Sequence, residues 1–168
     1  MLNVNSKNND PVELEVVKLI KSICDKYDVP IFTDTILVEK GVVPHSHPIL
    51  TLNARLKDER LILATLVHEQ FHWYVQNHPK YNKCIEYLKS KYADDGEHNK
   101  SGTYPNSYWE HIIVCFNTRN YLKDILSAEN LEWIYEQWQP YPTLEKMIVQ
   151  QHQKINADLD TFNMIFIK

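Results

Sequence analysis

"LATLVHEQFHWYV", residues 63–75, is the stretch that decides the fold. It is typical of a buried helix, because apolar side chains occur on nearly every side of it. His68, Glu69 and His72 nevertheless interrupt the apolar run. Burying polar titratable groups is costly unless they are paired or bind a metal. The stretch therefore predicts a central helix that carries chemistry as well as packing.

The spacing of the two histidines predicts a metal site. Residues four apart on a helix differ by about 40° in azimuth, so His68 and His72 project from one face, one turn apart. Two neutral imidazoles, one more protein ligand and a water molecule form the usual catalytic zinc site. Glu69 lies beside that position, where it can accept a proton from the zinc-bound water. The alternative is a pair of core histidines satisfied by hydrogen bonds.

The third ligand has to come from another segment, and Glu110 and His111 are adjacent candidates in "SYWEHIIVCF", residues 107–116. Neighbours on a helix lie about 100° apart, so normally only one of them points at the site. His111 lies nearer the centre of the predicted apolar face and Glu110 lies towards its margin. We predict His111 as the third ligand and keep Glu110 as the alternative. A Glu110 that is not a ligand would be an exposed first-turn carboxylate complementing the helix dipole.

The longer stretch "ILTLNARLKDERLILATLVHEQFH", residues 49–72, resembles the zincin metallopeptidases. Its layout of a strand, an LN-x-x-L element and an HExxH helix is most similar to SprT-like and related minimal zincin domains. The resemblance implies a zinc peptidase with His68 and His72 as ligands and Glu69 as general base. His111 would match a SprT-like third histidine, whereas Glu110 would match the glutamate of gluzincins. The resemblance also implies that the strand could take an extended peptide by strand addition.

A tyrosine or histidine could stabilise the oxyanion of a tetrahedral intermediate, as zincins often do. The candidates are Tyr104, Tyr108, Tyr141 and His152. We select Tyr141, which lies in a rigid turn between two prolines. The alternative for any one of these tyrosines is an aromatic side chain that only fills space.

Hydrophobic periodicity predicts a single α+β domain over residues 1–168, with a small N-terminal sheet followed by a mainly helical remainder. The resemblance implies that this domain is zincin-like. Strands are expected within residues 31–41 and 47–55. Helices are expected within residues 11–29, 58–77, 81–93, 107–126, 128–138 and 143–157. Asp10 and Asp58 are the expected N-caps of the first two helices, and Thr143 that of the last. The final segment, residues 161–168, is a terminal strand or a docked tail.

Composition narrows the function classes. The chain of 168 residues is 43% hydrophobic and 24% charged with a formal net charge of -4, which gives no basic surface for nucleic acid. No apolar run is long enough to span a membrane and no secretory signal is visible, so a cytoplasmic location is expected. The three cysteines suit reduced thiols. The three glycines are too far apart for nucleotide-binding loops or a nucleophile elbow.

The sequence therefore predicts a zinc-dependent metallohydrolase, first of all a metallopeptidase acting on a peptide or protein substrate, with Zn²⁺ as cofactor. The alternative is a non-catalytic zincin-like domain that binds metal or another protein. Its mark would be a closed site with four protein ligands, using both Glu110 and His111 or adding His98. His45 and His47 could bind a second metal, but a solvated loop is the expectation there. No pattern indicates an oligomeric state.

Overall fold

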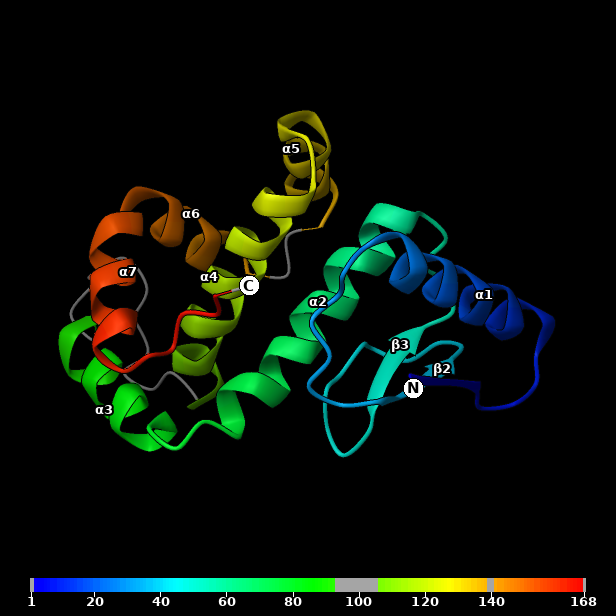
Figure 1. Ribbon diagram of the computed structural model, residues 1–168, viewed down its shortest axis with the longest axis horizontal. Coiled ribbons are helices and arrows are strands. Elements are labelled where there is room, and N and C mark those ends of the chain that lie inside the picture. Colours follow the sequence, from blue (N-terminus) through cyan, green and yellow to red (C-terminus); the bar gives the residue numbers. More distant parts are fainter. Residues whose placement is uncertain (1, 93–105, 139–140, 168) are drawn as a thin grey trace.

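The computed structural model describes residues 2–92, 106–138 and 141–167. Over these ranges the chain is α+β, as predicted, with a small three-stranded parallel sheet and seven helices (Figure 1). The strands are β1 (Asn3–Ser6), β2 (Thr35–Glu39) and β3 (Leu50–Asn53). The helices are α1 (Pro11–Lys26), α2 (Glu59–Gln76), α3 (Tyr81–Tyr92), α4 (Asn106–Ile125), α5 (Ala128–Gln137), α6 (Pro142–Gln150) and α7 (His152–Thr161).

The sheet has the order β1-β2-β3, and both pairs of neighbouring strands are parallel. Apolar residues alternate along β2, where Ile36 and Val38 are fully buried. The two strands expected from the sequence are confirmed at shorter lengths, whereas β1 was not predicted. It has only four residues and buries one apolar side chain, Val4, so its pattern carries almost no periodic signal.

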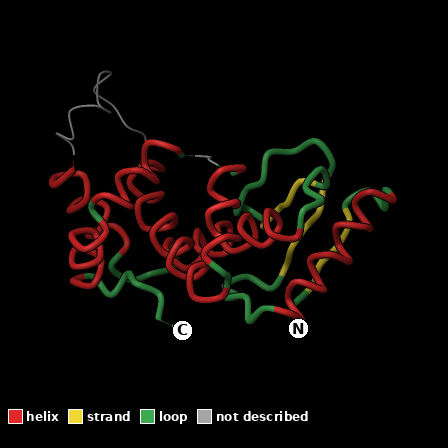
Figure 2. The backbone as a smooth tube through the Cα atoms, turned by 90° about the horizontal axis from the view of Figure 1, so that it is seen from above, coloured by secondary structure: helices red, strands yellow, loops and turns green. Residues whose placement is uncertain are grey.

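Helix α2 runs along the middle of the molecule and joins its two parts (Figures 1 and 2). The sheet and α1 lie at one end of the molecule, and α3, α4, α6 and α7 lie at the other (Figure 1). The expected N-cap is confirmed, since the Asp58 carboxylate accepts a hydrogen bond from the backbone N–H of Arg60 at 2.9 Å. Helix α2 packs against α1, β3, α4 and α5. It is therefore buried on nearly all sides, as the opening stretch predicts.

Two buried amides attach irregular segments to the central helices. The Gln70 side chain on α2 accepts hydrogen bonds from the backbone N–H groups of Phe32 and Thr33 and donates to the Thr33 carbonyl. On α4, Asn117 donates to the Met164 carbonyl and accepts from the backbone N–H of Phe166. The segment after α7 is thus a docked tail rather than a strand, which decides between the two alternatives.

The last predicted helix, residues 143–157, is divided in the structure. Helix α6 begins at Pro142 and α7 begins at His152. The cap prediction for Thr143 is wrong, because Tyr141 occupies the N-cap position without a side-chain cap hydrogen bond. Proline at the first helical position favours this earlier start, since its fixed φ suits the helix and its missing N–H would be unsatisfied there anyway.

Two further expectations concern the cysteines and the membrane. The three cysteines are free, as expected. None of the helices in the described part of the chain is long and apolar enough to cross a bilayer.

A buried carboxylate holds α1 against the sheet. Glu13, in the first turn of α1, is completely buried. Its oxygens accept hydrogen bonds from the Ser6 hydroxyl, from the backbone and side chain of Asn8, and from the backbone N–H of Lys40. Burial acts to raise the pKa of Glu13, but these hydrogen bonds outweigh it and lower the pKa to about 2. The charged carboxylate is therefore part of the folded structure.

We predict that Glu13→Gln destabilises the protein by about 2 kcal/mol at pH 7, because an amide cannot accept all of these donors. The folded pKa lies below the ordinary value of 4.5. The contribution of the Glu13 carboxylate to the free energy of unfolding is thus complete above pH 4.5 and is lost as the pH falls towards 2. Urea unfolding at pH 7 and pH 3 should show a smaller difference between variant and wild type at pH 3. Glu15→Gln, an exposed change on the same helix, is the control, and equal effects of both variants would contradict the prediction.

Candidate metal centre

Three histidines from two helices come together where α2 packs against α4. His68 and His72 lie one turn apart on α2, and His111 lies on α4. One nitrogen of each ring lies within 4.8 Å of the others, and all three side chains are buried. This is close enough for one ion to contact all three after small side-chain rotations. The structure thus gathers the three residues that the sequence predicts as metal ligands.

Glu110 lies on the far side of His72 from this cluster. Its carboxylate accepts hydrogen bonds from Nδ1 of His72 at 2.5 Å, the Gln76 amide at 2.8 Å and the Tyr81 hydroxyl at 2.7 Å. Burial acts to raise the pKa of Glu110, but these hydrogen bonds outweigh it and lower the pKa to about 2. The expectation of an exposed first-turn carboxylate is wrong, since Glu110 is buried. It orients an imidazole, as carboxylates behind metal-binding histidines do.

The tautomers of two of the rings follow from these bonds. Nδ1 of His72 donates to the ionised Glu110, and Nδ1 of His111 donates to the Ser107 carbonyl at 2.5 Å. Both rings therefore keep Nε2 as the nitrogen whose lone pair can bind a metal. Burial, together with the neighbouring His72, lowers the pKa of His111 to about 4. Burial likewise lowers the pKa of His68 well below its usual value. Neutral imidazoles are the form that a metal requires.

His68 provides the test of whether these residues fit a metal ion. Its Nδ1 is buried and makes no hydrogen bond within the described ranges of the chain. Leaving a buried polar atom unsatisfied is destabilising, and such atoms are rare in folded proteins. An unsatisfied nitrogen beside two other buried imidazoles is expected where the chain folds around a group that it binds. Three imidazole nitrogen ligands suit zinc, and the residues therefore fit it.

Glu69 and the histidines share one pocket of about 370 Å³. Burial raises the pKa of Glu69 to about 7, although His72 and His45 act in the opposite direction. A carboxylate with such a pKa can take up and release a proton near neutral pH. The pocket also has an apolar part. Its lining residues are Val43, Pro44, His45, Ser46, Thr65, His68, Glu69, His72, His111, Trp138 and Tyr141.

The sequence resemblance implied that the outer edge of β3 could bind an extended peptide by strand addition. In the structure this edge is not free. The backbone N–H and C=O of Thr51 both bond to His45, at 2.8 and 3.1 Å, in an antiparallel bridge. The Asn53 side chain donates to the Val42 carbonyl at 2.6 Å. The segment before β3 therefore covers the edge that an extended peptide would have needed.

The four oxyanion candidates have different positions. Tyr141 lines the pocket, with its ring 4.1 Å from that of His111 between centroids, and burial raises the pKa of its hydroxyl. Tyr108 packs on Trp109 and is not among the residues that line the pocket. Tyr104 lies outside the described residues, as does His98. Sequence reasoning did not select Trp138 or Thr65 as pocket residues, because both have ordinary core patterns.

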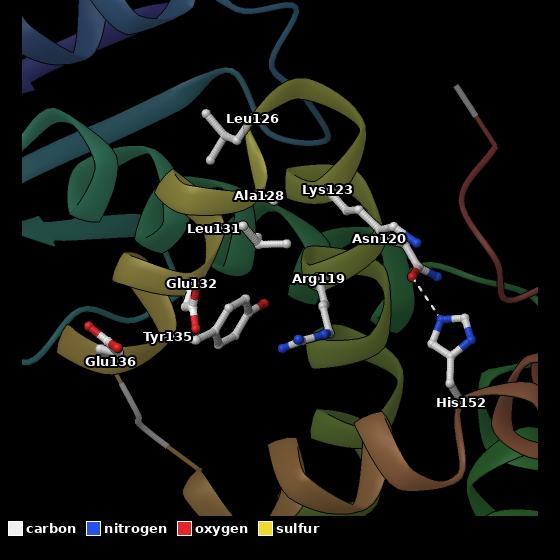
Figure 3. Close-up of a pocket in the computed structure, with 10 residues that line it drawn as sticks. All are labelled: Arg119, Asn120, Lys123, Leu126, Ala128, Leu131, Glu132, Tyr135, Glu136 and His152. Carbon is white, nitrogen blue, oxygen red and sulfur yellow. Dashed lines mark hydrogen bonds between the residues drawn. The ribbon is translucent and has the colours of Figure 1, made fainter.

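His152, the fourth candidate, faces a separate and larger hollow of about 740 Å³ (Figure 3). Nε2 of His152 lies 3.0 Å from the Asn120 side-chain oxygen, and Figure 3 shows the two rings of the hollow, His152 and Tyr135, on different helices. The Arg119 guanidinium lies over the Tyr135 ring at 4.4 Å and faces Glu145 at 3.5 Å. His152 is therefore placed away from the three-histidine cluster.

Comparisons of the chain with protein-family models, with curated proteins and with solved structures found no match.

We predict that the purified protein binds one zinc ion per chain and that alanine at His68, His72 or His111 abolishes binding. Glu110→Ala should keep the stoichiometry with about 10- to 100-fold weaker affinity, because the carboxylate only orients His72. Elemental analysis and competition with a chelator measure the two quantities. Glu86→Ala, an exposed change on α3, is the control. Loss of zinc from Glu110→Ala together with its retention by His111→Ala would make Glu110 the third ligand.

Proposed function

We propose that the protein is a zinc-dependent metallohydrolase, and that its substrates are peptides or proteins. The observation that supports this most strongly is the pocket in which three buried imidazoles lie beside a buried glutamate with a raised pKa. The resemblance of residues 49–72 to zincins supports the same proposal from the sequence. Among the described residues the ligand group contains three side chains, as in catalytic sites that keep one position for water or substrate.

The mechanism assigns one task to each side chain. Bound zinc would polarise the substrate carbonyl and lower the pKa of a water molecule. Glu69 takes the proton of the attacking water and later gives it to the leaving amine. Glu110 keeps His72 in the tautomer that leaves Nε2 free for the metal. Tyr141 keeps its proton at neutral pH and can donate a hydrogen bond to the oxyanion.

A non-catalytic metal site is the competing function. It would need a fourth protein ligand that closes the site. Apart from Glu69, the carboxylate adjacent in sequence to a cluster histidine is that of Glu110, and both of its oxygens are engaged by His72, Gln76 and Tyr81. The presence of Glu69 in an open pocket favours hydrolysis over a closed structural site.

We predict that zinc-loaded wild type cleaves members of a mixed library of fluorogenic peptides and that Glu69→Gln retains zinc but loses at least about 100-fold in rate. An amide cannot take the proton of the water, and general-base catalysis contributes about 10²- to 10⁴-fold. Peptide cleavage is followed by fluorescence, and new termini are identified by mass spectrometry in H₂¹⁸O.

The control for this experiment is Glu59→Gln, which changes a partly exposed carboxylate in the first turn of the same helix, paired there with Lys26. It should cleave at the wild-type rate. Full activity of Glu69→Gln would refute the role of Glu69. A zinc-loaded wild type that cleaves nothing in the library would favour the non-catalytic alternative.

A further inference from the structure

Thr65 is a buried polar residue of the pocket to which the proposed mechanism assigns no task. It lies on α2 one turn before Glu69, and only 2% of its surface is exposed. It lines the same pocket as the three histidines. Its hydroxyl oxygen is buried and has no hydrogen-bond partner in the part of the chain that the structure describes. A helical threonine commonly bonds the carbonyl four residues earlier, and here that bond is not made.

An unsatisfied hydroxyl in this position is destabilising for the free protein. Valine at position 65 has the same shape as threonine and would avoid the free-energy cost of burying this hydroxyl. Threonine also populates two χ1 rotamers on a helix, so a single rotation can exchange its hydroxyl and methyl groups. The hydroxyl can therefore turn towards a partner that enters the pocket.

His45 supplies a second polar group to the same pocket from a different segment. Its backbone is held by the two hydrogen bonds to Thr51 on β3. The next residue is attached to the active-site helix, because the Trp73 indole donates to the Ser46 carbonyl at 2.8 Å. Nδ1 of His45 donates to the Val43 carbonyl at 2.9 Å, which leaves Nε2 as its second polar atom. His45 is exposed, as the sequence predicted for this loop, but its backbone and Nδ1 are held by these hydrogen bonds.

The two groups together fit a peptide group better than a simple acyl compound. A hydroxyl can donate and accept, and a neutral imidazole that donates through Nδ1, as His45 does to Val43, accepts at Nε2. A peptide group offers one N–H and one C=O. Because the edge of β3 is covered by the segment that carries His45, backbone pairing along that edge cannot supply this recognition. Side chains in the pocket would have to do so.

We propose that Thr65 and His45 form a polar subsite that binds a peptide group of the substrate next to the scissile bond. This rests on the proposed function and deepens it, since it selects peptides over simple amides and esters.

The test compares two zinc-chelating probes by isothermal titration calorimetry on the zinc-loaded protein. N-acetyl-leucine hydroxamate carries one peptide group beyond the chelating group, and acetohydroxamate carries none. Thr65→Val should bind the first probe about tenfold more weakly, as for the loss of one hydrogen bond. It should bind acetohydroxamate like wild type. The same variant should have a higher Tm, because it removes an unsatisfied buried hydroxyl.

Thr118→Val is the matched control, because Thr118 has a buried hydroxyl without a hydrogen-bond partner but is not among the residues that line this pocket. It should bind both probes like wild type. His45→Ala should also weaken the first probe selectively, and His45→Gln should restore most of the affinity, since the glutamine amide reaches to about the position of Nε2. These variants retain all three histidines of the cluster.

Each result has one meaning. Unchanged affinity of both Thr65→Val and His45→Ala for the peptide-containing probe would overturn the subsite while leaving the metal site intact. Equal weakening of both probes would overturn it as well, since that reports a disturbed metal. Failure of wild type to bind zinc or acetohydroxamate would instead refute the proposed function, and the subsite with it.

Discussion

The hydrogen bond between His72 and Glu110 is the interaction on which the arrangement of the candidate site depends. It joins α2 to α4 inside the core, where neither partner could remain unpaired at an acceptable cost. Glu110 and His111 are neighbours, so their side chains leave α4 about 100° apart. Once Glu110 is fixed behind His72, His111 is directed to the front of the same ring. One contact therefore orients an α2 ring and brings the α4 ring to it.

The scaffold around that contact is built from polar side chains that are buried and satisfied. Gln70 ties the segment before β2 to α2, and Asn117 ties the C-terminal tail to α4. Glu13 does the same for α1 and the loops near the sheet. Because buried polar groups tolerate little change in geometry, these bonds hold irregular segments at defined positions on the two central helices. The pocket itself is lined by side chains of α2 and α4, by the segment before β3, and by residues next to α5 and α6.

The pocket contains two buried polar atoms without partners in the described part of the chain, whereas Gln70, Asn117 and Glu13 are hydrogen-bonded. These atoms are Nδ1 of His68 and the hydroxyl of Thr65, whereas elsewhere on α2 both the oxygen and the nitrogen of the buried Gln70 side chain have partners in the described ranges. Burial also keeps His68 and His111 neutral and raises the pKa of Glu69. Each of these features costs stability in the free chain, and such costs concentrate where a protein binds something. Two independent chemical arguments, tautomer and unsatisfied atoms, therefore lead to the same pocket.

The sequence by itself determined the α+β class, the central helix and its Asp58 cap. It also placed His68, Glu69 and His72 on one helix. These features follow from local periodicity and spacing. The sequence also favoured His111 over Glu110 from the apolar face of α4, and the relation to zincins stays a prediction. The tertiary structure alone decided that Glu110 is buried behind His72, that β1 completes the sheet, that the edge of β3 is covered and that Thr65 and His45 share the pocket. All of these depend on contacts between residues far apart in the chain, whose side-chain directions no local pattern encodes. The physical reason is that a helix fixes the relative positions of its own residues, whereas the partners of its buried polar groups are chosen only by packing.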